Sequence, residues 1–191
     1  MIKLTEISKS YGQKTVFEAF SCVMEENAVT CIMGASGGGK TTLLRLMLGL
    51  ELPDNGCIEG FNDLQKSVVF QEDRLCENLN AAANIRLVCR KPAKTGSIAD
   101  AMNALGFPEG YAKRPVRLMS GGEKRRVAIL RALAADYDVL FMDEPFKGLD
   151  TETKKRAIQY VKEQTKGKTV IFVTHDISEC EAMGGMVIAV G

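Results

Sequence analysis

The chain has 191 residues, 46% hydrophobic and 26% charged, which is ordinary for a single globular domain. Its 25 basic and 24 acidic side chains give a net charge of +1, so no overall basic field favours nucleic acid as a partner. The apolar runs are far shorter than the roughly 18 residues of a membrane span, and the first residues lack the apolar core of a signal peptide. We therefore expect one domain, residues 1–191, that stays in the cytoplasm unless a partner holds it at a membrane.

The first 50 residues predict strands, a glycine loop and a helix, in that order. Two runs within residues 2–25 alternate apolar and polar side chains, which favours an antiparallel pair with a turn near Tyr11. The apolar run 28–33 predicts a short buried strand that ends in the glycine loop. The residues 40–50 that follow predict a helix, stopped by Pro53 and the turn residues after it.

The rest of the chain predicts two short strands, a helical middle and an alternation of strands and helices. Residues 57–61 and 67–70 are the short strands, and we expect residues 72–128 to form a helical subdomain within the single domain. Strands and helices then alternate over residues 138–142, 150–165, 169–174, 176–183 and 186–190. This order predicts an α/β fold with a mostly parallel sheet, an antiparallel N-terminal β portion and an α-helical insert.

The stretch "GASGGGKT" fits the phosphate-loop pattern G-x-x-x-x-G-K-[ST], between a predicted strand and a predicted helix. Backbone N–H groups of such a loop cradle phosphates, and the helix N-terminus adds its dipole. Lys40 is expected to reach the β- and γ-phosphates, and the Thr41 hydroxyl to ligate Mg²⁺. The expected nucleotide-binding residues of this P-loop NTPase core are Gly34, Ala35, Ser36, Gly37, Gly38, Gly39, Lys40, Thr41 and Thr42.

Two adjacent acids end the apolar strand "VLFMDEP". A carboxylate at the tip of a buried parallel strand, beside a phosphate loop, is where a magnesium partner belongs, so Asp143 is the metal-side carboxylate. Glu144 is placed to polarise a water against the γ-phosphate, as general base or orienting group. Taken alone, two such acids are more often a solvated strand end.

A second glycine-rich helix start occurs at "LMSGGEKRR". Ser120 can cap the helix, and the glycines after it leave backbone N–H groups open to an anion. One bound nucleotide does not need two such sites in one chain. The alternative is an ordinary turn and helix start.

The order of the phosphate loop, Gln71, "MSGGE", "FMDEP", "GLD" and "THD" resembles the nucleotide-binding subunit of an ATP-binding-cassette (ABC) transporter over essentially the whole chain. That resemblance implies an ATPase with ATP and Mg²⁺ as cofactors. It also explains the second helix start, because two such subunits face each other head to tail and share each ATP. The residues that would bind the partner's ATP are Ser120, Gly121, Gly122, Glu123 and Asp150.

The resemblance assigns further roles residue by residue. Tyr11 matches the aromatic residue that stacks on adenine, and Gln71 matches the glutamine that touches Mg²⁺ beside Thr41 and Asp143. His175 falls at the γ-phosphate-sensing histidine, although a lone histidine is otherwise an ordinary core or surface residue. The implied catalytic residues are Glu144, His175, Lys40 and Gln71.

Two positions qualify the resemblance. Asp150 could equally cap the helix that follows it, and both roles are compatible. Glu123 stands where the family most often has glutamine, although acids also occur there.

The implied function is a motor that powers a separate membrane permease, with import favoured. Residues 70–75, "FQEDRL", resemble the segment found in importers of nitrate, sulfonates and taurine. Expected partners are a second ABC ATPase subunit, taken to be a copy of this chain, integral membrane permease subunits and a substrate-binding protein, at the cytoplasmic face of the membrane. The alternatives are a non-transport ABC ATPase of DNA repair, chromosomes or translation, and a small-molecule kinase.

Overall fold

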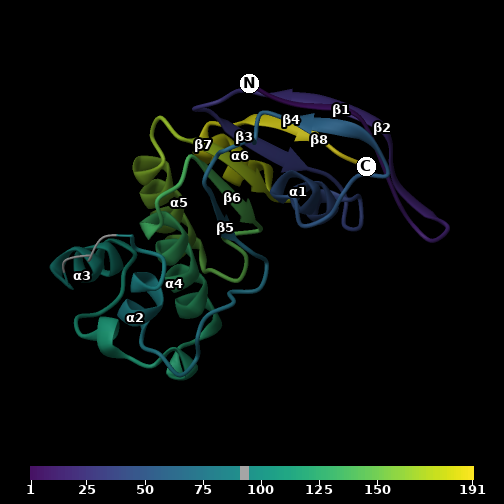
Figure 1. Cartoon of the computed structure of the whole chain (residues 1–191). Coiled ribbons are helices and arrows are strands. Elements are labelled where there is room, and N and C mark those ends of the chain that lie inside the picture. Colours follow the sequence, from purple (N-terminus) through teal and green to yellow (C-terminus); the bar gives the residue numbers. More distant parts are fainter. Residues whose placement is uncertain (91–94) are drawn as a thin grey trace.

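The computed structural model describes residues 1–90 and 95–191, and its strands form two sheets (Figure 1). The smaller sheet is antiparallel and has the order β2-β1-β4. Its strands are β1 (Ile2–Tyr11), β2 (Lys14–Met24) and β4 (Asn55–Glu59). The predicted N-terminal pair is confirmed, since β1 and β2 meet at a turn directly after Tyr11, where Gly12 has a φ of +60°.

The larger sheet is parallel and has five strands in the order β5-β6-β7-β3-β8. Its strands are β3 (Val29–Met33), β5 (Lys66–Val69), β6 (Val139–Asp143), β7 (Thr169–Val173) and β8 (Met186–Ala189). The predicted α/β fold with a mostly parallel sheet and an antiparallel N-terminal portion is therefore confirmed.

The central strands β6 and β7 of the parallel sheet are buried along their whole length because both faces of the sheet are covered there. In β6, Phe141 packs into one hydrophobic cluster, whereas its neighbours Leu140 and Met142 pack into the other. Successive side chains of a strand point to opposite faces, so a strand buried on both sides reads as an unbroken apolar run.

Helices and the small sheet supply the two covering layers. On one face α1 (Lys40–Leu48) packs together with β1 and β2, and on the other lie α4 (Gly121–Ala134), α5 (Thr151–Gln164) and α6 (Ile177–Met183). The pair Phe61–Phe141 lies in the first cluster, with ring centroids 5.6 Å apart. The pair Phe146–Phe172 lies in the second, at 6.2 Å. These layers hold the ends of β3, β6 and β7 in fixed positions.

Helix α1 ends earlier than its sequence predicts. Gly49 adopts a left-handed φ of +73°, and its N–H bonds the carbonyls of Arg45 and Leu46. Glycine reaches this conformation without the steric penalty of a Cβ, so it terminates the helix four residues before Pro53. The prediction that Pro53 stops the helix is therefore wrong.

The helical part lies at the opposite end of the molecule from the antiparallel sheet (Figure 1). It contains α2 (Ala81–Arg86), α3 (Thr95–Ala104) and two 3-10 turns, η1 (Tyr111–Lys113) and η2 (Val116–Leu118), packed near α4. Residues 91–94 of the predicted subdomain 72–128 lie outside the described residues, and the subdomain's boundaries stay a prediction, as does the single domain 1–191. Within residues 1–90 and 95–191, no helix has the length and apolar character needed to cross a bilayer.

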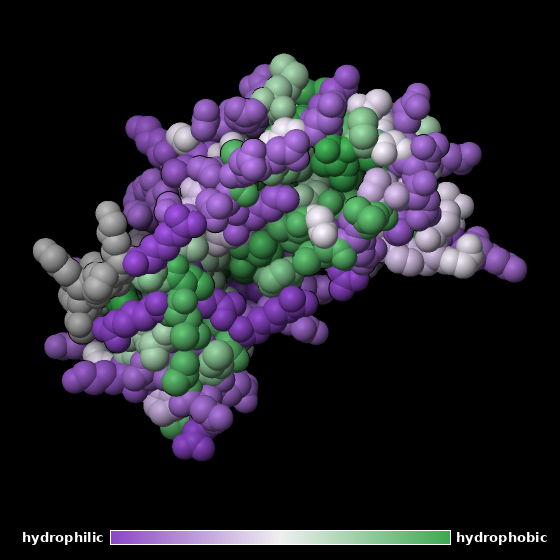
Figure 2. Space-filling model, in the orientation of Figure 1, coloured by the Kyte–Doolittle hydropathy of each residue, from purple (hydrophilic) through white to green (hydrophobic). Residues whose placement is uncertain are grey.

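The surface between the two ends is partly apolar. Figure 2 shows hydrophobic side chains in the middle of this face, between the β part and the helical part, with hydrophilic side chains around them. Leu79 and Leu87, on either side of α2, are among the exposed large hydrophobic residues. Exposed apolar area of this kind is typical of a surface that meets another protein.

Candidate nucleotide site

The phosphate loop connects β3 to α1, and at two of its positions only glycine fits. Gly39 has a φ of +92°, and a Cβ there would lie 2.6 Å from Val16 and 2.7 Å from Phe17. At Gly34, a Cβ would lie 1.9 Å from the carbonyl oxygen of Val190. The glycines thus let the loop pass close to β2 and to the end of β8 while its N–H groups begin helix α1.

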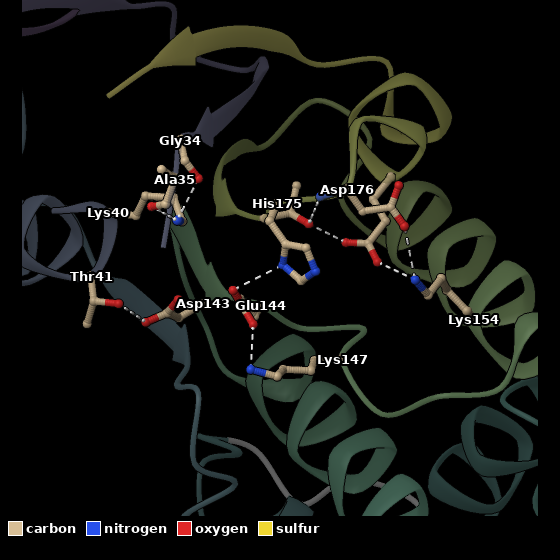
Figure 3. Close-up of polar contacts among 12 residues, drawn as sticks. Gly34, Ala35, Lys40, Thr41, Asp143, Glu144, Lys147, Lys154, His175 and Asp176 are labelled. Atoms are coloured by element: carbon tan, nitrogen blue, oxygen red, sulfur yellow. Dashed lines mark hydrogen bonds and ion pairs between the residues drawn. The ribbon is translucent and has the colours of Figure 1, made fainter. Parts of the chain in front are cut away.

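Lys40 lies over the loop that it follows. Its Nζ donates hydrogen bonds to the carbonyl oxygens of Gly34 and Ala35, each at 2.8 Å, and the residue is only 8% exposed (Figure 3). An ammonium held in this way is a fixed positive charge at the N-terminus of a helix, where anions are stabilised.

Asp143, at the end of β6, faces the first turn of α1. The Thr41 hydroxyl donates to Asp143 Oδ2 at 3.1 Å (Figure 3). Burial raises the pKa of Asp143 above its usual value, the Thr41 hydrogen bond lowers it, and the nearby Glu144 charge raises it again. A buried carboxylate that is costly to ionise gains from a bound cation, and these oxygen donors, with Gln71 lining the same pocket, are the ligands that Mg²⁺ prefers.

Glu144 is held by two basic side chains, one on each carboxylate oxygen. His175 Nδ1 lies 3.2 Å from Oε1, and Lys147 Nζ lies 3.0 Å from Oε2 in an ion pair that lacks hydrogen-bond geometry (Figure 3). Burial raises the pKa of Glu144, but the contacts with Lys147 and His175 outweigh burial, and the net pKa is lowered. The carboxylate is therefore ionised and oriented at neutral pH.

A network of hydrogen bonds fixes the backbone around His175. The Thr174 hydroxyl donates to buried Glu179 at 2.7 Å and accepts from the N–H of Asp176 at 3.1 Å. Lys154 bridges Glu179 at 2.8 Å and Asp176 at 3.2 Å (Figure 3). The backbone on both sides of His175 is thus anchored, while its ring stays exposed.

One pocket of about 330 Å³, within the size range of small-molecule sites, gathers most of the predicted residues. The predicted residues on its wall are Tyr11, Ser36, Gly37, Gly39, Lys40, Thr41, Thr42, Gln71, Asp143 and Glu144. Gly34 and Ala35 contribute the carbonyls that hold Lys40, and the Gly38 N–H bonds Ala35. His175 lines an adjoining pocket that shares Glu144 with this one.

Tyr11 lies at the outer edge of the pocket and is 45% exposed. Its hydroxyl donates a hydrogen bond to Glu51, which also accepts from Arg45 at 3.0 Å. The Lys9 ammonium lies 5.5 Å from the ring centroid. The ring is therefore tethered at its hydroxyl and accessible over part of its surface, as a stacking platform requires.

The second glycine-rich helix start contributes nothing to the described wall of this pocket. Ser120 and Glu123 form a capping box, with the Ser120 hydroxyl accepting from the Glu123 N–H at 3.3 Å and Glu123 Oε2 accepting from the Ser120 N–H at 2.7 Å. Open space surrounds the Cα of Gly121, and Gly122 has only Leu149 and a carbonyl nearby. This helix start therefore presents an open surface at some other place on the molecule.

Asp150 is likewise absent from the described pocket wall and acts as a helix cap. Its Oδ1 accepts from the N–H groups of Glu152 and Thr153, at 3.1 and 3.0 Å. The capping role that the sequence allows is confirmed, and the role at a partner's ATP stays a prediction.

Several residues that line the pocket or contact its wall were not predicted. Lys14 and Val16 reach the pocket from β2, and the sequence signal for them is their closeness to Tyr11. Lys147 follows Glu144 by three residues, a spacing that lets the two side chains meet at a turn. Arg125, on α4, donates to the carbonyl of Glu144 at 3.2 Å, and no local pattern marks it.

The fold and the pocket together define a phosphate-loop nucleotide-binding ATPase. A family model described as ABC transporter matches residues 17–147. The chain belongs to the ABC transporter family, and it is an ATP-hydrolysing cassette of that family.

Individual relatives and solved structures agree with this membership. An aliphatic sulfonates import ATP-binding protein of Nocardia farcinica is 34% identical, over 98% of this chain and 76% of the relative. A sulfate/thiosulfate import ATP-binding protein of Rhizobium meliloti is 31% identical over 98% of this chain, which spans 56% of that relative. The dimeric ATP-binding cassette MJ0796, in a post-hydrolysis state with ADP and phosphate, superposes with a TM-score of 0.84 at 28% identity, covering 100% of this chain and 94% of that one.

Proposed function

We propose that this chain is the ATP-hydrolysing subunit of an importer and acts on a separate membrane permease. The pocket supports the proposal because it combines Lys40, the Asp143 carboxylate and an oriented Glu144 beside His175. The relatives support import, since their names describe import of aliphatic sulfonates and of sulfate or thiosulfate. Those cargoes differ, so the proposal concerns import and leaves the cargo open. The same names speak against a DNA-repair or translation role.

The proposed division of labour follows from charge and position. Lys40 and the loop N–H groups stabilise the negative charge of the transferring phosphoryl group, and Tyr11 stacks on the adenine. Glu144 accepts a proton from the attacking water, or orients that water, and His175 helps to hold it near the γ-phosphate. Because the contacts with Lys147 and His175 keep Glu144 ionised, no proton needs to leave this carboxylate before it acts.

We further propose that Thr41, Asp143 and Gln71 hold Mg²⁺. Bound there, Mg²⁺ would neutralise charge on the β- and γ-phosphates. The raised pKa of Asp143 supports this role, since a cation beside the carboxylate would favour its charged form.

We propose that the working unit is a pair of cassettes. Ser120, Gly121, Gly122, Glu123 and Asp150 would contact the ATP of the second subunit, which is taken to be a copy of this chain. The open surface at Gly121 supports this arrangement, as does the dimeric state of the similar cassette MJ0796. A helix terminus alone contributes only roughly 0.3–1 kcal/mol at an exposed site, so this surface would bind ATP only when a partner supplies the rest.

The remaining proposed partners are the permease subunits, with a substrate-binding protein outside. The exposed Leu79 and Leu87 of the helical part support docking to another protein. The chain would then work as a peripheral subunit on the cytoplasmic face of the membrane.

The substitution Glu144→Gln tests the proposed chemistry. The amide keeps the size of the side chain but accepts protons poorly, so hydrolysis should fall by about a hundredfold or more while the Kd for ATP changes little. Because ATP would remain unhydrolysed, the variant should elute as a dimer with Mg²⁺ and ATP and as a monomer with ADP. The rate of hydrolysis is measured by phosphate release, and the mass of the eluting species is measured by light scattering.

Glu181→Gln is the matched control, because it makes the same chemical change on the exposed surface of α6. It should hydrolyse ATP at the parental rate. Parental turnover by Glu144→Gln would contradict the role of Glu144, and a monomer in the presence of ATP would contradict the shared site.

A further inference from the structure

Arg125, on α4, is a buried cation that contacts two separate parts of the nucleotide site. The residue is 5% exposed. Its Nη1 donates to the carbonyl of Phe70 at 2.6 Å, and its Nη2 donates to the carbonyls of Gln71 at 2.9 Å and Glu144 at 3.2 Å. Nη1 also forms an ion pair with Asp73 at 3.2 Å. One guanidinium therefore joins the loop after β5 to the residue after β6.

These contacts use the fork geometry of arginine. The guanidinium presents several N–H donors in one plane, so it can reach carbonyls on two chain segments at once, whereas an ammonium acts as a point charge. Removing a buried charge from its partners leaves their polar groups unsatisfied, which is costly. The position of Gln71 is in this way tied to the position of Glu144.

The backbone of Glu144 needs such support. Its φ is +45°, in the left-handed region that a residue with a Cβ adopts only when its surroundings hold it there. Its N–H donates to the carbonyl of Val173 at 2.9 Å, and its own carbonyl accepts from Arg125. Both peptide groups of the strained residue are thus fixed, and with them the direction in which its carboxylate points.

We propose that Arg125 is a positioning residue for ATP hydrolysis, which acts by holding Glu144 in place against the loop that carries Gln71. This inference rests on the proposed roles of Glu144 and Gln71. A consequence is that a movement of Phe70 and Gln71 at the start of this loop shifts Glu144 as well, so Gln71 and the carboxylate respond together.

Arg131 offers a matched comparison on the same helix. Its Nη1 donates to the carbonyl of Arg74 at 2.7 Å and its Nη2 to the carbonyl of Asp73 at 3.0 Å. Arg131 therefore bonds carbonyls of the same loop as Arg125, but at residues that follow Gln71 in the chain. A substitution of Arg131 therefore perturbs the loop without touching the bond to Glu144.

The test measures kcat, the Kd for ATP and the melting temperature of the purified chain with Mg²⁺ and ATP. Arg125→Gln should lower kcat by about tenfold to a hundredfold, because small misplacements of a catalytic group have effects of that size, while the Kd changes by less than about threefold. Arg125→Lys should retain part of the rate, since it keeps the charge without the fork. Arg131→Gln should keep kcat within about twofold of the parental value.

A double-mutant cycle with Glu144→Gln separates positioning from general damage. In the Glu144→Gln background, adding Arg125→Gln should change the residual single-turnover rate by less than about threefold, because the carboxylate that Arg125 positions is already gone. A full additional loss would show an effect independent of Glu144 and would overturn the inference.

The remaining outcomes are also decisive. A parental kcat in Arg125→Gln, beside an inactive Glu144→Gln, overturns this inference and leaves the proposed function intact. A parental rate in Glu144→Gln overturns the proposed role of Glu144 and this inference with it. If Arg125→Gln does not fold, Arg125→Lys decides the matter: a parental kcat overturns the inference, and a lower kcat at parental Kd supports it.

Discussion

The two oxygens of the Glu144 carboxylate face different partners. His175 Nδ1 lies 3.2 Å from Oε1, and Lys147 Nζ lies 3.0 Å from Oε2. Both partner side chains are more than half exposed, at 66% for His175 and 55% for Lys147. A water that approaches Glu144 can therefore displace either of them, since an exposed ion pair is weak.

Lys147→Gln should shift the pH dependence of hydrolysis. The contact with Lys147 helps to lower the pKa of Glu144, so the carboxylate stays charged to a lower pH than a glutamate with its usual pKa. Without the cation the pKa rises, and the rate should begin to fall at a higher pH as the solution is acidified. The measurement is kcat from about pH 4 to 8. The control is Lys155→Gln, which makes the same charge change on the exposed side of α5 and should leave the fall of kcat at low pH where it is. If the fall of kcat at low pH does not shift in Lys147→Gln, Lys147 does not set the pKa of Glu144.

Among the elements, helix α4 links the second glycine-rich start to the nucleotide pocket. Its N-terminus carries the Ser120–Glu123 capping box, and one turn later Arg125 enters the core. The cap satisfies N–H groups that the first turn of any helix leaves without intrahelical partners. The stability of the N-terminus of α4 and the open surface at Gly121 thus depend on the same short segment, residues 120–123.

Ser120→Ala should destabilise the protein by about 1 kcal/mol, because it removes the side-chain acceptor of the cap. For a chain of this length the melting temperature should fall by roughly 2–4 °C, measurable by calorimetry without nucleotide. Glu123→Gln keeps the capping box, since glutamine also accepts the Ser120 N–H, and should melt close to the parental protein. A Ser120→Ala variant that melts with the parental protein would show that the cap is not stabilising.

Local patterns were sufficient to predict most of the elements, since each strand and helix carries its own period and its own end signals. The end of α1 was misplaced because Pro53 is a more visible stop than Gly49, although the glycine carries the αL cap. Local patterns predict neither the order of the strands in the sheet nor the contacts of Arg125. Arg125 bonds carbonyls 54 and 55 residues earlier in the chain, and only the packing of α4 against the loop after β5 brings them together.

For the molecule as a whole, the nucleotide pocket joins parts of the chain that are far apart in sequence. Lys40 begins helix α1 on one face of the sheet, whereas Asp143 ends the central strand β6 and Glu144 follows it. These residues are about 100 positions apart in the chain, as the Thr41–Asp143 separation of 102 shows. The unfolded chain does not assemble them, so ATP binds the folded state and must stabilise the entire fold.

Lys40→Ala should weaken this stabilisation. At an ATP concentration of about 100 times the Kd, the parental chain should gain about 2.7 kcal/mol, and a tenfold weaker variant only about half as much at the same concentration. Each variant is compared with its own melting curve without ATP, because loss of the bonds to Gly34 and Ala35 also changes the empty protein. Lys155→Ala, an exposed lysine of α5, should keep the full ATP-induced shift. An equal shift in Lys40→Ala would mean that ATP stabilises the fold without this lysine, and the phosphate loop would lose its assigned role.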